Sequence, residues 1–147
     1  MDFKLEVVVV PVADVDKAKA FYQQLRWRED ADFTVGDGFR VVQFTPPGSE
    51  CSIIFGTGVT NGEPGSLQGL QLTVKDVVAA REHLLGLGIE VSGVWHDADG
   101  VFHHAGTANR VDGPDADRRD YGSWLSFEDP DGNGWFLQEI VNRAPGR

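Results

Sequence analysis

An internal repeat is the feature of this sequence that most restricts its fold. Residues 8–15 (VVVPVADV) align with residues 70–77 (LQLTVKDV), 62 positions later, and Ala18 then aligns with Ala80. In each copy an apolar strand pattern gives way to apolar residues at helical spacing. A repeat at a fixed offset indicates one supersecondary unit used twice. The sequence therefore predicts two similar α+β modules.

Each copy predicts the element order βαβββ. Asp14 and Asp76 stand where a helix N-cap belongs, and Gly88 supplies a left-handed residue to end the second helix. Arg26 occupies that position in the first copy, where a positive φ costs about 1 kcal/mol. We expect strands at residues 7–10, 27–35, 39–45 and 52–55 in the first copy and at 70–74, 90–95, 123–127 and 135–140 in the second.

The spacing of these elements predicts one domain spanning residues 1–147. Module one covers residues 5–56, a linker rich in Gly, Asn and Pro covers 57–66, and module two covers 67–140. Module two carries an inserted loop, residues 96–121, between its second and third strands. A loop of this length within a compact domain is usually a lid or a binding loop; the alternative is a disordered decoration.

Composition narrows the classes of function. Thirteen basic against 23 acidic side chains give a formal net charge of -10, which repels nucleic acid. This charge favours a cationic or neutral small ligand, unless it serves solubility alone. The one cysteine, Cys51, excludes an internal disulfide and a cysteine zinc site. Without an apolar run of about 20 residues or a secretory signal pattern, we expect a cytoplasmic protein that does not bind membranes.

Two motifs carry a resemblance to a known family. They are Val10-Pro11-Val12-Ala13-Asp14 with Ala20-Phe21-Tyr22, and the turn sequence FEDPDGN at residues 127–133. With the paired modules, they make residues 5–140 resemble the vicinal oxygen chelate superfamily, which includes glyoxalase I, extradiol dioxygenases and the fosfomycin and bleomycin resistance proteins. The resemblance implies an α+β fold in which two fused βαβββ modules form a curved mixed sheet around a cleft. It also implies a homodimer.

The resemblance further implies a metal ion on inward-facing strand positions. The usual histidine near the start of the first strand aligns with Val7, and its counterpart in the second module aligns with Gly69. The final-strand glutamate aligns with Phe136, or with Trp135 after a slip of one residue. Valine, glycine and phenylalanine offer no O, N or S donor from their side chains to a metal. We therefore expect neither a metal nor another cofactor at this site.

The inserted loop holds the candidate catalytic residues His96, His103, Arg119 and Tyr121. His96 or His103 suits acid–base chemistry near neutral pH, and Arg119 or Tyr121 suits a carboxylate or carbonyl group. A second interpretation is a relocated metal site, with two of the histidines His96, His103 and His104 and a nearby carboxylate. The nearby carboxylates are Asp97, Asp99, Asp112 and Asp115. Ordinary polar residues of a lid, hydrogen-bonded to the backbone, are the third.

Amide and aromatic side chains on the expected strands and loop are candidates to line the cleft. Neutral amides suit recognition, and ligand pockets are mainly apolar and aromatic. Because strand side chains alternate, Phe136 and Gln138 share a face and Glu139 points the other way. The ordinary alternatives are a solvated strand face and the core. The candidate ligand-binding residues are Gln43, Gln71, Trp95, Phe102, Trp124, Phe136 and Gln138.

These observations predict a metal-independent protein, similar to bleomycin-resistance-type binding proteins, that holds a small, largely apolar or aromatic organic ligand in its cleft. The alternative is a lyase or isomerase of the same superfamily. It would use His96 or His103 with Tyr121 or Arg119 as acid–base groups, or a relocated divalent metal.

Overall fold

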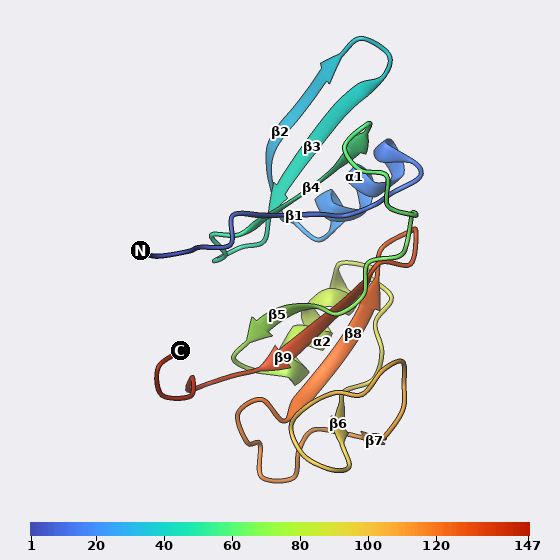
Figure 1. The fold of residues 1–147 in the computed structure, drawn as a ribbon. Helices are drawn as coiled ribbons and strands as arrows, with labels where there is room; N and C mark the ends of the chain where they lie inside the picture. The colour runs from blue at the N-terminus through green and yellow to red at the C-terminus, as the bar shows by residue number, and fades with distance from the viewer. The chain divides into compact units, whose positions relative to one another are not determined.

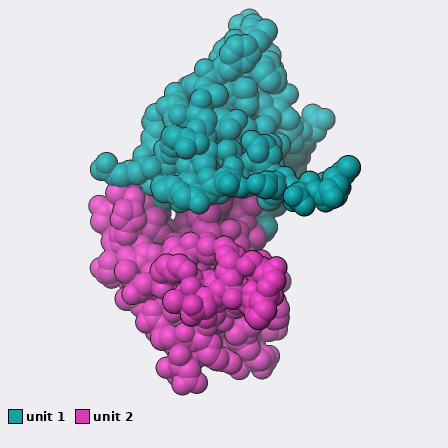
Figure 2. Space-filling model, turned by 90° about the vertical axis from the view of Figure 1, so that its left-hand side faces the viewer, with its two compact units in different colours: residues 1–68, 129–133 teal, residues 69–128, 134–147 magenta.

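The computed structural model describes all 147 residues and contains two helices and nine strands (Figure 1). It divides into two compact units, coloured separately in Figure 2. Unit 1 comprises Met1–Gln68 with Asp129–Asn133, and unit 2 comprises Gly69–Glu128 with Gly134–Arg147. Each unit holds one mixed sheet and one helix, which confirms the predicted α+β class of two modules. That they form one domain stays a prediction.

Unit 1 has a four-stranded sheet in the order β1-β4-β3-β2. Strands β1 and β4 are parallel, and the other pairs are antiparallel. One face of the sheet packs on α1, where Ala18 and Tyr22 are buried among Phe44 and Phe55. The elements are β1 (Val7–Val9), α1 (Val15–Gln24), β2 (Arg28–Val35), β3 (Phe39–Thr45) and β4 (Ser52–Thr57).

The turn sequence at residues 129–133 lies within unit 1, although its flanking strands belong to unit 2. Asp129 accepts a hydrogen bond from the Tyr22 hydroxyl at 3.1 Å, and the Asn133 amide donates to the Pro11 carbonyl at 2.8 Å. The Ala13 amide donates to the Asp131 carboxylate at 3.1 Å. Because these bonds join the two motifs of the family resemblance, they explain why the motifs occur together.

Unit 2 has a five-stranded sheet in the order β5-β9-β8-β6-β7. Its helix begins at the predicted N-cap Asp76, whose carboxylate accepts from the Val78 and Ala79 amides. Its elements are β5 (Leu70–Val74), α2 (Val77–Gly86), β6 (Trp95–Asp97), β7 (Arg110–Asp112), β8 (Ser123–Glu128) and β9 (Gly134–Glu139). Neither helix of the chain is long and apolar enough to cross a membrane.

The expected strand at residues 90–95 is wrong except for its last residue, since β6 begins at Trp95. Before β6, Ser92 bonds to β8 through its side chain as well as its backbone. The Ser92 amide donates to the Ser126 carbonyl and the Ser92 hydroxyl accepts from the Ser126 amide, both at 2.9 Å, so no regular strand pairing forms there. Strand β7, which lies inside the inserted loop and pairs with β6, was not predicted from the sequence. The insertion is therefore partly a hairpin.

Strand register separates the unit 2 sheet into two faces. Glu139 lies on the helix face, because its carboxylate accepts from the amide of Val77, the first residue of α2. By alternation, Phe136 and Gln138 lie on the opposite face. Trp124 lies opposite Gln138, and Trp95 lies opposite Trp124, so both tryptophans share this face. We call it the open face of unit 2.

Candidate functional site

Three aromatic rings meet on the open face of unit 2. Trp95 and Trp124 are stacked, with ring centroids 5.6 Å apart and an interplanar angle of 8°. Phe136 meets both edge-on, at 6.0 Å from Trp95 and 5.8 Å from Trp124. Offset-stacked and edge-to-face geometries are the favourable ones for aromatic pairs. These rings, with His103 and Arg110 described below, are called the aromatic cluster.

The two stacked tryptophans carry buried donors without a protein partner. Trp95 is 3% exposed and Trp124 is 1% exposed. Neither Nε1–H has a hydrogen-bond partner. A buried donor left unpaired costs about 1–3 kcal/mol, and such groups are few in native structures. Two adjacent unpaired donors make this part of the sheet a candidate binding site.

His103 covers this surface from the loop between β6 and β7. Its ring centroid lies 4.5 Å from that of Phe136 and 5.2 Å from that of Trp124. The loop thus brings His103 to two of the predicted ligand-binding aromatics, Trp124 and Phe136. Phe102, the next residue in the loop, is 82% exposed and lies outside the cluster.

Arg110 completes the aromatic cluster. It is not among the site residues predicted from the sequence. Its guanidinium lies 4.0 Å from the Trp95 ring centroid and 6.0 Å from that of Phe136. An arginine over an aromatic face gains cation–π attraction. Burial lowers the pKa of Arg110. Arg110 is one of three arginines in the insertion, with Arg118 and Arg119, so nothing in the sequence distinguished it. Its position depends on the unpredicted strand β7.

The remaining loop candidates are held by other partners. His96 lies on the face opposite to Trp95, because neighbouring strand residues alternate, and its Nδ1 donates to the Gly113 carbonyl at 2.8 Å. Arg119 hydrogen-bonds Asp115 at 2.6 to 3.1 Å and holds the pKa of that carboxyl at about 2. The Tyr121 hydroxyl accepts from the Ala144 amide at 2.7 Å. No hydrogen bond joins these three side chains, so the structure does not assemble them as one acid–base group.

The three candidate glutamines lie in different surroundings. Gln138 is 7% exposed on the open face, and its amide donates to the Tyr121 carbonyl at 2.9 Å. Gln71 lies opposite Phe136 in the β5–β9 pair and is exposed. Gln43 belongs to β3 of unit 1. Gln71 and Gln138 therefore border the aromatic cluster by register, whereas Gln43 belongs to the other unit.

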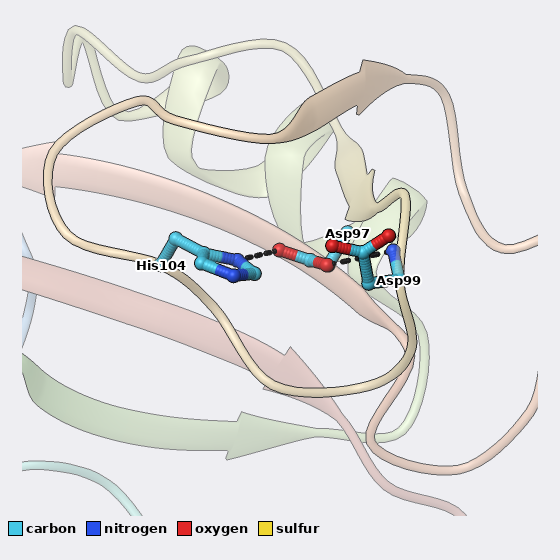
Figure 3. A group of neighbouring side chains, drawn as sticks. All are labelled: Asp97, Asp99 and His104. Atoms are coloured by element: carbon cyan, nitrogen blue, oxygen red, sulfur yellow. Dashed lines mark hydrogen bonds and ion pairs between the residues drawn. The ribbon is translucent and has the colours of Figure 1, made fainter.

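A second group of side chains, Asp97, Asp99 and His104, lies at the base of the same loop (Figure 3). Their potential ligand atoms all lie within 4.8 Å of one another. The His104 imidazole points at the buried Asp97 carboxylate, 2.5 Å away, and the Asn109 amide donates to both aspartates. Burial acts to raise the pKa of Asp97, but hydrogen bonds from the Asp99 amide, His104 and Asn109 lower it. Carboxylate and imidazole donors suit a divalent ion.

The three positions where the family resemblance implies a metal ion do not fit one. Val7 lies in β1, Gly69 precedes β5 with φ 80°, and Phe136 packs in the aromatic cluster. None of their side chains carries a donor atom for a metal. The Asp97, Asp99 and His104 group occupies other positions in the sequence, so it is not the family's site.

Comparison with known proteins agrees with this architecture. A family model described as the Glyoxalase/Bleomycin resistance protein/Dioxygenase superfamily matches residues 4–137. The structure of TnmS3, an antibiotic binding protein from Streptomyces sp. CB03234, is 28% identical with a TM-score of 0.65, covering 95% of this chain and 98% of that one. A glyoxalase/bleomycin resistance protein from the same strain is 29% identical with a TM-score of 0.62, covering 92% and 100%. The curated proteins give no match.

A third solved structure shows the fold alone. It is a member of the glyoxalase/bleomycin resistance protein/dioxygenase superfamily from Sphaerobacter thermophilus, 22% identical with a TM-score of 0.67. It covers 94% of this chain and 98% of that one. The likeness therefore extends over both modules and the insertion.

Proposed function

The chain belongs to the glyoxalase/bleomycin resistance protein/dioxygenase superfamily, and from that premise we propose that it binds a small, largely apolar or aromatic organic molecule without a metal. The observation that carries the proposal is the aromatic cluster, where two stacked indoles present unpaired N–H donors. Pockets for small molecules combine such apolar walls with a few polar groups that fix orientation. The aromatic cluster offers apolar ring surfaces together with two indole N–H donors and the Arg110 guanidinium.

A flat ligand would bind by taking the place of the His103 ring against Phe136 and Trp124. Burying about 150 Å² of aromatic surface is worth about 4 kcal/mol. Each edge-to-face pair adds about 0.5–1.5 kcal/mol. An acceptor atom on the ligand would also satisfy the indole donors of Trp95 and Trp124. Binding by this route needs no acid, base or metal.

The relatives support binding as the activity. TnmS3 is described as an antibiotic binding protein, and it is 28% identical to this chain over almost its whole length. An antibiotic-like aromatic molecule is therefore the ligand class that we propose for this protein. Its cytoplasmic location is part of the same proposal.

A homodimer is also part of the proposal, and unit 1 supports it. Asp32 of β2 hydrogen-bonds Lys19 of α1, so its neighbour Phe33 lies on the face that α1 leaves uncovered. Phe33 and Val35 are 58% and 56% exposed there. A second copy of the chain would bury this apolar face. Phe33→Ser should lower the association constant at least tenfold in sedimentation, and unchanged association would contradict this assignment.

The binding proposal is tested by titrating chelator-treated protein with aromatic compounds while following tryptophan fluorescence. We expect saturable quenching that survives the chelator. Trp124→Phe keeps a ring but removes one donor, and should weaken binding at least threefold; Phe3→Ala, at an exposed aromatic residue, is the control. Absence of quenching by every aromatic compound would overturn the proposal.

A second candidate function has one observation in its favour, the Asp97, Asp99 and His104 group. A divalent ion there would make the protein a lyase or isomerase candidate with a relocated metal. Equilibrium dialysis against Mn²⁺ or Zn²⁺ tests this alternative. One bound ion per chain, lost in Asp99→Asn and retained in Asp117→Asn, would favour it over metal-independent binding.

A further inference from the structure

We propose that the ligand of the aromatic cluster carries an anionic or carbonyl oxygen and that Arg110 selects for it. The inference rests on the proposed function, since it names the chemistry of the molecule bound there. It runs against the expectation from net charge, which favoured a cationic ligand.

The charge of Arg110 is not used by a carboxylate of the protein. Its one hydrogen bond goes from Nη2 to the Gly106 carbonyl, at 3.1 Å, although a guanidinium has five N–H donors. Asp97 lies directly opposite Arg110 in the β6–β7 pair. The Asp97 oxygens instead accept from the Asp99 amide, His104 and Asn109.

Several other arginines of the chain do pair with carboxylates. Arg40 hydrogen-bonds Asp16 and Asp32, with 2.8 Å between Nη1 and the Asp16 carboxylate. Arg28 bonds Asp30 at 2.6 Å, and Arg119 bonds Asp115. Acidic side chains outnumber basic ones by 23 to 13, so there are more than enough carboxylates for every arginine to pair with one. The half-buried guanidinium of Arg110 has no carboxylate partner.

Two aromatic groups beside Arg110 are donors as well, although the exposed Asp112 lies opposite Trp95 in the β6–β7 pair. Trp95, whose ring lies 4.0 Å from the guanidinium, has an unpaired Nε1–H, and so does the stacked Trp124. An indole nitrogen can only donate, and a guanidinium can only donate. A ligand ammonium group would meet like charge and no acceptor among these three. A carboxylate, phenolate or carbonyl oxygen would accept charge-assisted hydrogen bonds.

The net charge of the chain does not outweigh this local arrangement. At physiological ionic strength the Debye length is about 8 Å, so most surface carboxylates are screened from the cluster. A partly buried cation is screened much less. The long-range field slows the approach of an anion, while the contact at Arg110 determines which ligand stays bound.

Calorimetric titration with three probes that share one ring system tests the inference. The probes are 2-naphthoate, 2-acetylnaphthalene and 2-naphthylmethylammonium, which are anionic, neutral with a carbonyl, and cationic. We expect 2-naphthoate to bind at least tenfold more tightly than the ammonium probe, with 2-acetylnaphthalene between them. Arg110→Gln should reduce this ratio to below threefold, and Arg110→Lys should retain part of it.

Arg28→Gln is the matched control, because it removes the same charge from an exposed side chain of unit 1 and should leave the ratio unchanged. Thermal unfolding of each variant separates lost selectivity from lost folding. Equal binding of all three probes, or tighter binding of the ammonium probe, would overturn this inference while leaving aromatic binding intact. No binding of any probe would count against both proposals.

Discussion

The two units share the order βαβββ, with β7 added in unit 2, but they differ on the sheet face that the helix leaves uncovered. In unit 1 this face is left exposed and apolar, with Phe33 and Val35 more than half exposed. In unit 2 the corresponding face carries stacked tryptophans that are almost fully buried, with His103 against Trp124 and Arg110 over Trp95. The scaffold is common to both units, and the candidate site depends on the insertion that only one of them has.

The largest expected effect is on the covered face. Trp124→Ala removes a fully buried ring and should lower the free energy of unfolding by about 3–5 kcal/mol. Phe33→Ala on the open face of unit 1 should change it by less than about 1 kcal/mol. Urea denaturation of both variants, at a concentration where the chain is monomeric, checks the contrast. Similar losses would show that the two faces are equally covered.

A smaller effect concerns the start of α2. Glu139 is 2% exposed, accepts from the Val77 amide at 2.9 Å and pairs with Arg118. Glu139→Gln should cost about 2 kcal/mol, because hydrogen bonds to a charged group are lost. The exposed Glu82 of the same helix, changed to Gln, is the control.

The ion pair of Glu139 with Arg118 makes the stability of the chain depend on pH. Hydrogen bonding from Arg118 holds the pKa of Glu139 below its ordinary value of 4.5. A carboxyl whose pKa is lower in the folded state contributes stability that is complete above its unfolded pKa and is lost as the pH falls through its folded pKa. Stability should therefore fall below about pH 4.5. The Glu139→Gln variant should show a shallower fall, and an identical acid profile would contradict this role.

The smallest effect compares the ends of the two helices. Arg26 has φ 59° and its counterpart Gly88 has φ 78°. Because only glycine adopts this conformation without strain, Arg26→Gly should stabilise the chain by up to about 1 kcal/mol and Gly88→Ala should destabilise it by about 1 kcal/mol. Thermal unfolding checks both signs. Shifts in the same direction would show that the two ends are not equivalent.

Local physics explains how much of the fold could be predicted. The N-caps Asp14 and Asp76 follow from residues close along the chain, and the structure confirms them. Arg26, aligned with Gly88 by the repeat, has a positive φ. The strand expected at residues 90–95 failed because Ser92 bonds Ser126, which lies 34 positions away. Such a contact leaves no periodic signal.

The candidate site was predictable only in part, for the same reason. Phe136 and Gln138 could be assigned to one face by alternation along β9, whereas placing Trp124 with them needs the register of β8 against β9. Arg110 could not, because its place over Trp95 depends on the pairing of β6 with β7 inside a loop whose path the sequence does not specify. Arg119 and Tyr121 had suitable chemistry, but their partners Asp115 and the Ala144 amide are visible only in three dimensions.

The central claim is that the aromatic cluster of unit 2 is the place where a small aromatic molecule binds. The chain has four tryptophans, whose indole N–H groups give separate signals in a ¹⁵N–¹H correlation spectrum, assigned with single Trp→Phe variants. On titration with 2-naphthoate, the signals of Trp95 and Trp124 should shift together and saturate, while those of Trp27 and Trp135 stay in place. Shifts confined to Trp27 and Trp135, or no shift at Trp95 and Trp124 at saturating probe, would contradict the claim.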